Sequence, residues 1–199
     1  MKRIIAFLLM FVPFVCVAQN LIRCNDSTFY FVSQKENYYA YLKLSGKIGD
    51  SGNPRVIEYN NKALQAMLIN KQKYLSRGDD DTSILSEYVL GEMNYFTNLF
   101  QTKLQVTMVP GQLLTGQKVL IWYFDLPESQ PETNDGKQIT EPAMKQVSIS
   151  MISEGYIYSI GTTQFKYQSL DELTTLLTRL ITTVRFSHEP IDANTLCGN

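Results

Sequence analysis

The sequence predicts an α+β fold in which an antiparallel sheet is flanked by helices, as in an α/β/α sandwich. Three observations near the carboxyl end support this prediction. Residues 146–151 alternate polar and apolar side chains, the period-2 pattern of a half-buried strand. A turn at residues 153–155 then leads into Tyr156–Ile160, an aromatic and β-branched return strand. An amphipathic helix follows over residues 169–186.

The predicted helix begins with a capping box, in which Ser169 is followed three residues later by Glu172. Its apolar residues recur at helical spacing and form one stripe: Leu173, Leu176, Leu177, Leu180, Ile181 and Val184. The opposite face is rich in threonine, which is a mediocre helix former. Packing onto the sheet must therefore hold this helix in place.

The first 18 residues have the features of a secretory signal peptide. Lys2 and Arg3 precede an apolar run, and small residues at Cys16 and Ala18 mark a cleavage site before Gln19. A membrane anchor is the alternative, but the run is shorter than the roughly 20 residues that a spanning helix needs. We therefore expect an exported protein, periplasmic or extracellular, whose residues 19–199 form a single α+β domain with flexible tails.

The charge of the mature chain argues against a nucleic-acid partner. Removing residues 1–18 takes away two basic residues and no acidic one, which leaves 16 basic and 19 acidic residues and a net charge of −3. Nucleic-acid-binding proteins normally carry a basic patch or stripe. No segment after the signal peptide is apolar enough to predict a membrane span.

The amino-terminal half begins with a predicted strand pair at residues 28–32 and 38–44. Tyr39 and Tyr41 make the second strand aromatic. Such rings stack on sugars in some proteins, but they more often cover the sheet and reach water with their hydroxyls. A short edge segment is predicted at residues 56–57, and a helix is predicted from about residue 60 to residue 75.

A second helix is predicted over residues 82–101, capped by Asp81 or Thr82. Its expected inward residues are Ile84, Leu85, Tyr88, Val89, Phe96, Leu99 and Phe100. The acidic run at residues 79–81 invites a calcium interpretation. An EF-hand loop starting there would need glycine and glutamate where Ile84 and Leu90 stand, so helix capping is favoured.

Two more strands and a loop complete the predicted elements. Residues 104–108 alternate and are closed by Pro110-Gly111. Residues 118–124 form an apolar run without alternation, which is typical of a central strand covered on both faces. The polar, proline-containing stretch at residues 127–143 is predicted to be a mobile loop, either a functional lid or a disposable insertion.

The composition excludes several kinds of chemistry. His188 is the single histidine, and a catalytic triad would have to use it from the tail that follows the last helix. The mature chain offers only this histidine and two cysteines for a metal site built on imidazoles or thiolates. Phosphate-loop, dinucleotide and zinc-protease motifs do not occur in the sequence. We therefore assign no catalytic, cofactor-binding or metal-binding residues, although paired carboxylates in the loops remain open. Asn25-Asp26-Ser27 fits a glycosylation sequon, a match that is common by chance.

The two cysteines that remain after export are candidates for a disulfide bond. Cys24 lies just before the first predicted strand, and Cys197 is followed only by two residues. In an oxidising compartment such a pair is expected to bond, and the termini of one domain often lie close together. Two free thiols, or a link between two chains, are the alternatives.

In the order of its elements, the chain resembles the PsbP-like superfamily over about residues 28–187. The matching parts are the early strand pair, the helix before residues 104–108, the Gly116-Gln117-Lys118 turn into a long strand, and the closing hairpin and helix that ends Val184-Arg185-Phe186-Ser187. The resemblance implies an antiparallel sheet between helices. Members are mostly accessory or binding proteins, such as photosystem assembly factors and a Ran-binding factor, and the resemblance transfers no catalytic residue and neither of these partners.

Two functional classes follow from these observations. The first is a non-enzymatic binding or accessory domain of the cell envelope, which engages an envelope protein or small ligand through a sheet face or the 127–143 loop. The second is a small secreted hydrolase or ligand-binding protein with a pocket of carboxylates or tyrosines. The poverty in histidine and cysteine favours the first class over an enzyme.

Overall fold

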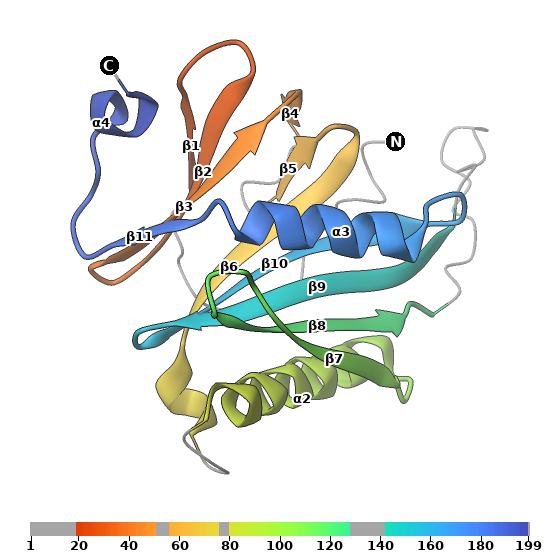
Figure 1. Ribbon diagram of the computed structural model, residues 1–199. Helices are drawn as coiled ribbons and strands as arrows, with labels where there is room; N and C mark the ends of the chain where they lie inside the picture. Colours follow the sequence, from red (N-terminus) through yellow and green to blue (C-terminus); the bar gives the residue numbers. More distant parts are fainter. Residues whose placement is uncertain (1–18, 51–55, 76–79, 128–141, 199) are drawn as a thin grey trace.

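Two antiparallel sheets form the framework of the protein in the computed structural model, which describes residues 19–50, 56–75, 80–127 and 142–198 (Figure 1). The larger sheet has seven strands in the order β4-β5-β6-β10-β9-β8-β7, and the smaller has four in the order β1-β2-β3-β11. The predicted signal peptide and most of the 127–143 loop lie outside the described residues.

Each sheet pairs its strands with antiparallel neighbours. The larger sheet contains β4 Ile48–Asp50, β5 Val56–Tyr59, β6 Lys62–Asn70, β7 Val106–Gln112, β8 Lys118–Asp125, β9 Ala143–Ser153 and β10 Tyr156–Phe165. The smaller sheet contains β1 Gln19–Arg23, β2 Thr28–Lys35, β3 Tyr38–Ser45 and β11 Arg185–Ser187. The early strand pair and the closing hairpin are therefore confirmed.

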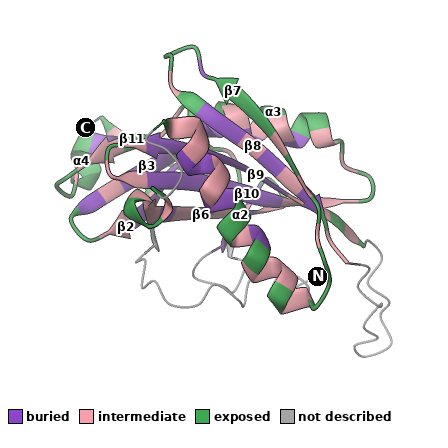
Figure 2. Ribbon diagram, turned by 90° about the horizontal axis from the view of Figure 1, so that it is seen from below, coloured by how far each residue is buried: buried purple, intermediate pink, exposed green. Residues whose placement is uncertain are grey.

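Helices cover both faces of the larger sheet, which confirms the predicted α/β/α arrangement. Helix α2, Asp81–Phe100, packs on one face against Leu120, Trp122 and Phe124 of β8. Helix α3, Leu170–Ile181, packs on the other face, where the smaller sheet contributes to the same core. Figure 1 shows the two helices on opposite sides of the sheet, and Figure 2 shows buried residues along β8, β9 and β10 between them.

The closing hairpin is more deeply buried than its sequence pattern predicted. Strands β9 and β10 pair from Ser153–Tyr156 outward, and the positive φ of the turn falls on Glu154. Ser148 and Ser150 are buried together with the apolar residues that alternate with them. The prediction of a half-buried strand is therefore wrong, because α2 covers the face that the serines occupy.

Helix α3 begins as predicted but ends earlier. The Ser169 hydroxyl accepts a hydrogen bond from the Glu172 amide, and four apolar residues of the stripe are fully buried: Leu173, Leu177, Leu180 and Ile181. The helix ends at Ile181 rather than at residue 186, because residues 185–187 pair with β3 as strand β11. The Thr183 hydroxyl fixes this change of direction by donating to the Lys43 carbonyl oxygen.

The helix predicted over residues 60–75 is wrong, because most of this segment is strand β6. Asn60 and Asn61 both have positive φ, at 48° and 61°, and form a tight hairpin turn from β5 into β6. Burial then alternates through Leu64, Ala66 and Leu68. Only residues 71–74 are helical, as the short 3₁₀ helix η1, Lys71–Tyr74.

Helix α2 matches its prediction except at the cap. Its N-cap is Asp80, not Asp81 or Thr82, and the Asp80 carboxylate accepts hydrogen bonds from the amides of Thr82 and Ser83. Hydrogen bonds from Ser83 are the main reason that the pKa of Asp80 is lowered. Asp80 of the acidic run therefore serves as the cap. Met93 is buried, whereas the expected inward residues Phe96, Leu99 and Phe100 are half-buried.

Strand β7 is longer than predicted, and strand β8 is placed as predicted. Strand β7 starts at Val106 and continues through Pro110-Gly111, where the sequence predicted an end. This is possible because β7 is an edge strand, where proline costs no interior ladder bond. Strand β8 lies between β7 and β9 with buried residues on both faces, as predicted.

Cys24 and Cys197 form a disulfide bond, with Cα atoms 5.2 Å apart. Cys197 ends the short helix α4, Ala193–Cys197, whose Leu196 packs on the outer face of the smaller sheet against Tyr30, Val32 and Tyr41. The predicted pairing of the two cysteines is thus present in the structure. In the part of the chain that the structure describes, no helix has the length and apolar character required to cross a bilayer.

Candidate functional site at the turn end of the sheets

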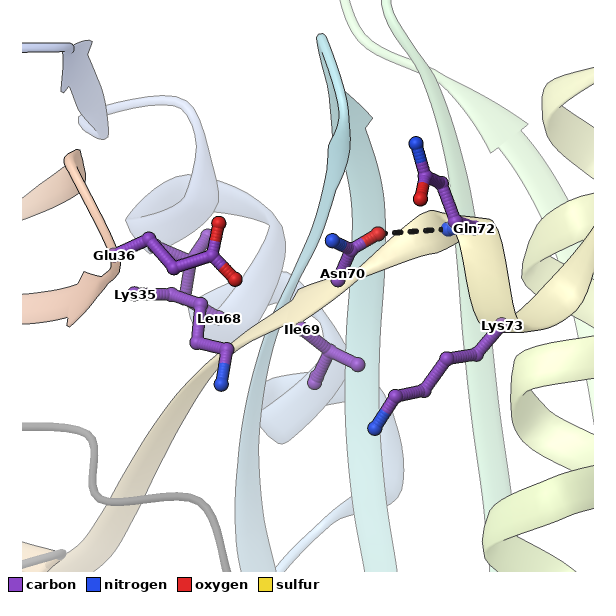
Figure 3. A pocket seen from close by; sticks show the side chains of 7 residues that line it. All are labelled: Lys35, Glu36, Leu68, Ile69, Asn70, Gln72 and Lys73. Carbon is purple, nitrogen blue, oxygen red and sulfur yellow. Dashed lines mark hydrogen bonds between the residues drawn. The ribbon is translucent and has the colours of Figure 1, made fainter.

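A hollow of about 310 Å³ lies where the β2–β3 turn approaches the end of β6 and the start of η1 (Figure 3). Its walls come from three elements: the β2–β3 turn, the end of β6, and η1, which follows β6 directly. The lining residues are Lys35, Glu36, Leu68, Ile69, Asn70, Gln72 and Lys73. We call this hollow the turn-end site.

The β2–β3 hairpin supplies one wall. Lys35 and Tyr38 form the last pair of the hairpin, and Glu36 takes the positive φ of 56° that the tight turn requires. The side chain of Gln34 donates a hydrogen bond to the Glu36 carbonyl oxygen and closes the turn. Lys35 and Glu36 are thereby held beside β6.

The other wall is where β6 changes into η1. Asn70 caps η1, because its side-chain oxygen accepts a hydrogen bond from the Gln72 amide at 2.9 Å. The Lys71 amide donates to the Gly155 carbonyl oxygen at 2.9 Å, which fastens this corner to the β9–β10 turn. Leu68 is buried beneath the hollow, and Lys73 projects from η1 with an exposed side chain.

A cluster of aromatic rings supports the hairpin wall. The Tyr38 ring stacks on Tyr156 at 4.6 Å and on Phe186 at 5.7 Å between ring centroids. The Tyr156 hydroxyl donates to the Glu36 carboxylate at 3.1 Å, and the Tyr38 hydroxyl is 2.8 Å from the Ser153 hydroxyl. Burial is the main reason that the pKa values of both tyrosines are raised, so both phenols are neutral at physiological pH.

The single histidine lies next to this cluster. His188 Nε2 is 2.6 Å from a Glu154 carboxylate oxygen, and the imidazole ring lies 5.0 Å from the Tyr38 ring. Both partners of the pair are more than half exposed, with 58% and 59% of their side-chain surface open to solvent. Within the described residues, Ser153 contacts Tyr38 and not His188, so these groups do not form a nucleophile-and-base pair.

The electrostatics of the turn-end site are set by two lysines. Over the described ranges, neither Lys35 nor Lys73 has an ion-pair partner. The one carboxylate in the wall, Glu36, accepts the Tyr156 hydrogen bond. The site therefore presents two ammonium groups and one carboxylate, which leaves it with a net positive charge, together with the amide side chains of Asn70 and Gln72. This combination suits a ligand with anionic oxygen atoms.

A second unusual carboxyl group lies away from this site. Glu92 is half-buried on α2, and burial raises its pKa to about 7. The negative charge of Glu92 contributes to raising the pKa values of Tyr74, Tyr88 and Tyr95. These tyrosines therefore lie near it, Tyr74 on η1 and the other two on α2. Considering only the described residues, no three histidine, cysteine, aspartate or glutamate side chains gather where they could hold a metal ion.

Two other features singled out from the sequence, the sequon at Asn25 and the aromatic strand at Tyr41, lie away from the turn-end site. The Asn25 side-chain oxygen accepts hydrogen bonds from the amides of Ser27 and Thr28 and thus shapes the β1–β2 turn. Tyr41 is buried beside Leu196, and its hydroxyl accepts a hydrogen bond from the Ile191 amide, so its ring covers the sheet and is not a sugar platform.

The residues of the turn-end site were not identified from the sequence. Lysines and amides in turns carry no motif, and residues 68–73 were assigned to a helix. The sequence analysis did not use the Asn60-Asn61 pair, which could have indicated a hairpin because asparagine tolerates the positive φ of a tight turn.

Comparisons with known proteins give a likeness of fold alone. No protein-family model matches the sequence. No curated protein matches it either. The structure is similar to the solution structure of cyanobacterial PsbP from Synechocystis sp. PCC 6803, with a TM-score of 0.43 and 7% sequence identity over 89% of this chain and 97% of that chain. No residue role is transferred from this similarity.

Proposed function

We propose that this protein is an exported binding domain of the cell envelope that acts without catalysis and engages a partner protein through the turn-end site. The observation that carries the proposal is the pair of lysines Lys35 and Lys73, which stand on separate elements around one hollow. Neither lysine has an ion-pair partner among the described residues, and together they outweigh the single Glu36 carboxylate in the lining. Ammonium groups placed in this way recognise charge on a partner.

The hydrogen bonding beside the hollow supports binding over catalysis. Groups that could act as acids, bases or nucleophiles are engaged with one another: Glu36 with Tyr156, Glu154 with His188, and Ser153 with Tyr38. General acid–base catalysis needs such a group within reach of substrate and with a pKa near the working pH. The raised pKa values of Tyr38 and Tyr156 move both hydroxyls further from that range.

Export is supported by two features of the chain. The first 18 residues have the charged, apolar and small-residue sections of a signal peptide. The Cys24–Cys197 bond is of the kind that persists in oxidising compartments such as the periplasm or the extracellular space. Together they support a mature chain of residues 19–199 that works outside the cytoplasm as a single domain.

A second candidate function is a small secreted hydrolase or ligand-binding protein. The observation that favours it is the chain of contacts that links Glu36, which lines the hollow, to a neighbouring group of ionisable side chains: Tyr156, Tyr38, His188 and Glu154. For catalysis, a bound substrate would have to displace one of the contacts that now occupy these groups.

Site-specific crosslinking distinguishes the two functions. A photo-reactive amino acid is placed at Asn37, which is exposed in the hairpin turn, or at Lys103, which is exposed at the far end of α2. We expect an envelope protein to be captured from Asn37 and not from Lys103. The capture should be lost when Lys35 and Lys73 are both changed to alanine.

A panel of hydrolase substrates is tested with the same preparations. Turnover that is lost in Glu36→Gln would support the second candidate and contradict the first. Equal capture from Asn37 and Lys103, or capture that is indifferent to the two lysines, would also contradict the proposed binding function.

A further inference from the structure

We infer that the carboxyl-terminal segment at residues 188–198 is a strap that is released by reduction. It covers the outer face of the smaller sheet while Cys24 and Cys197 are bonded, and it leaves that face when a dithiol reductant opens the bond. We call this segment the strap. The inference goes beyond the proposed function, because it concerns the outer face of the smaller sheet and not the turn-end site.

The outer face of the smaller sheet is apolar and needs a cover. Alternate residues of β2 and β3 lie on opposite faces of the sheet, and those on the inner face belong to the core beneath α3: Phe29, Phe31, Ala40, Leu42 and Leu44. Tyr30, Val32 and Tyr41 are on the outer face and are also buried. A sheet that is apolar on both faces has to bury both of them. Within the described chain, the residues that join this outer cluster from beyond the sheet and its β1–β2 turn are Ile191 and Leu196, both in the strap.

The strap crosses this face from one edge of the sheet to the other. It leaves β11 at one edge, and its far end is bonded to Cys24, which directly follows β1 at the opposite edge (Figure 1). Between these ends, the Ile191 amide donates a hydrogen bond to the Tyr41 hydroxyl at 2.7 Å. Leu196 is the one fully buried residue of the strap, so the rest of it is open to solvent to some degree.

Without the disulfide bond, few contacts hold the far half of the strap. Helix α4 has five residues, whereas isolated helices shorter than about 12 residues are marginal in water. What remains is the burial of Leu196 and the contact of Ile191 with Tyr41. The exposed contact between His188 and Glu154 lies at the start of the strap. Opening the bond therefore frees α4, while the start of the strap stays beside the β9–β10 turn.

The bond is accessible to a reductant, because Cys24 and Cys197 are both half-buried rather than enclosed. One thiolate of the dithiol attacks a sulfur atom of the bond and forms a mixed disulfide, and the second thiol then displaces the protein sulfur. Two electrons and two protons pass to the protein in this exchange. Cys24 and Cys197 end as thiols, and the reductant leaves as a disulfide.

Hydrogen exchange followed by NMR tests the release in the mature chain, with dithiothreitol as the dithiol. The amides of Ile191, Leu196 and Gly198 are the reporters, because each donates a hydrogen bond in the docked strap. We expect reduction to speed their exchange by about tenfold or more, while amides of β9 and β10 stay protected over the same minutes. Reoxidation should restore the slow exchange. Cys24→Ser/Cys197→Ser is the matched control, and its reporter amides should exchange fast with or without dithiothreitol.

The dye anilinonaphthalene sulfonate reports whether the apolar face is uncovered. We expect its fluorescence to rise by about twofold or more when the wild type is reduced, and to be high in the double serine variant under both conditions. Intact mass after alkylation verifies that both thiols are free in the reduced sample.

Three outcomes would each overturn the inference. The first is unchanged exchange of the reporter amides in fully reduced protein. The second is a loss of protection throughout β9 and β10, which would mean that the bond holds the whole fold and not the strap alone. The third is a released strap without any gain in dye fluorescence, which would mean that the outer face is not exposed.

Discussion

Glu92 is the ionisable residue whose environment has the clearest consequence for stability. Burial raises its folded-state pKa to about 7, well above the usual value for glutamate. The folded protein therefore holds this proton at pH values where the unfolded chain has lost it. By linkage, stability is highest below the unfolded pKa and falls as the pH rises from about 4.5 to about 7.

We expect Glu92→Gln to remove this pH dependence. The neutral amide keeps the shape of the protonated acid, so the variant should be more stable than the wild type by about 3 kcal/mol near pH 8 and about equal to it near pH 4. Urea unfolding of both proteins across this range measures the difference. Glu172→Gln, at an exposed position on α3, is the control. Parallel pH profiles for wild type and Glu92→Gln would show that burial does not shift the pKa of Glu92.

A buried network of hydrogen bonds explains why serine is tolerated in the core. Trp122 Nε1 donates a hydrogen bond to the Ser150 hydroxyl at 3.0 Å, and Ser150 donates to the Ser159 hydroxyl at 2.8 Å. Both serines are buried between the sheet and α2. Polar groups removed from water need such partners, and the strand pattern alone did not reveal them.

At the scale of elements, α3 depends on its apolar stripe for its position. Leu177 is fully buried in the core between the sheets, whereas Thr175 on the same helix is exposed. Leu177→Asp places an unpaired charge in that core, so we expect cooperative thermal unfolding to be lost. Thr175→Asp should unfold cooperatively within a few degrees of the wild type. A Leu177→Asp variant that melts like the wild type would contradict the packing of α3.

The same stripe shows what sequence patterns can predict. Helix α3 was recognised because its cap and six apolar positions agree, and the β9–β10 hairpin because its alternation and turn agree. The helix predicted over residues 60–75 is wrong because the apolar positions Leu64, Met67 and Leu68 suit both a helical face and a strand. The strand forms because β5 and β10 pair with it from both sides, which is a tertiary cause.

The turn-end site was beyond prediction for a related reason. Its lysines are 38 positions apart in the sequence, at Lys35 and Lys73, and nothing local links them. They meet because the β2–β3 turn and the end of β6 lie at the same end of the two sheets. That juxtaposition requires the strand order of both sheets, and the incorrect helix at residues 60–75 concealed it.

At the scale of the whole molecule, the two sheets share one core but are joined by few elements. Strand β11 carries the chain from α3 on the larger sheet to the edge of β3 in the smaller one. The pair of His188 and Glu154 then ties the following segment to the β9–β10 turn. Because this contact is exposed, it contributes little, and packing supplies most of the connection.

The Cys24–Cys197 bond is the remaining long-range tie, and it fastens α4 beside the β1–β2 turn. It spans a sequence separation of 173 residues, for which the chain-entropy model gives about 5 kcal/mol of stabilisation. We expect reductant to lower the urea midpoint of the wild type markedly and to leave a Cys24→Ser/Cys197→Ser variant unchanged. Intact-mass analysis after alkylation without reductant should find no modified thiols, whereas two alkylated cysteines would contradict the bond.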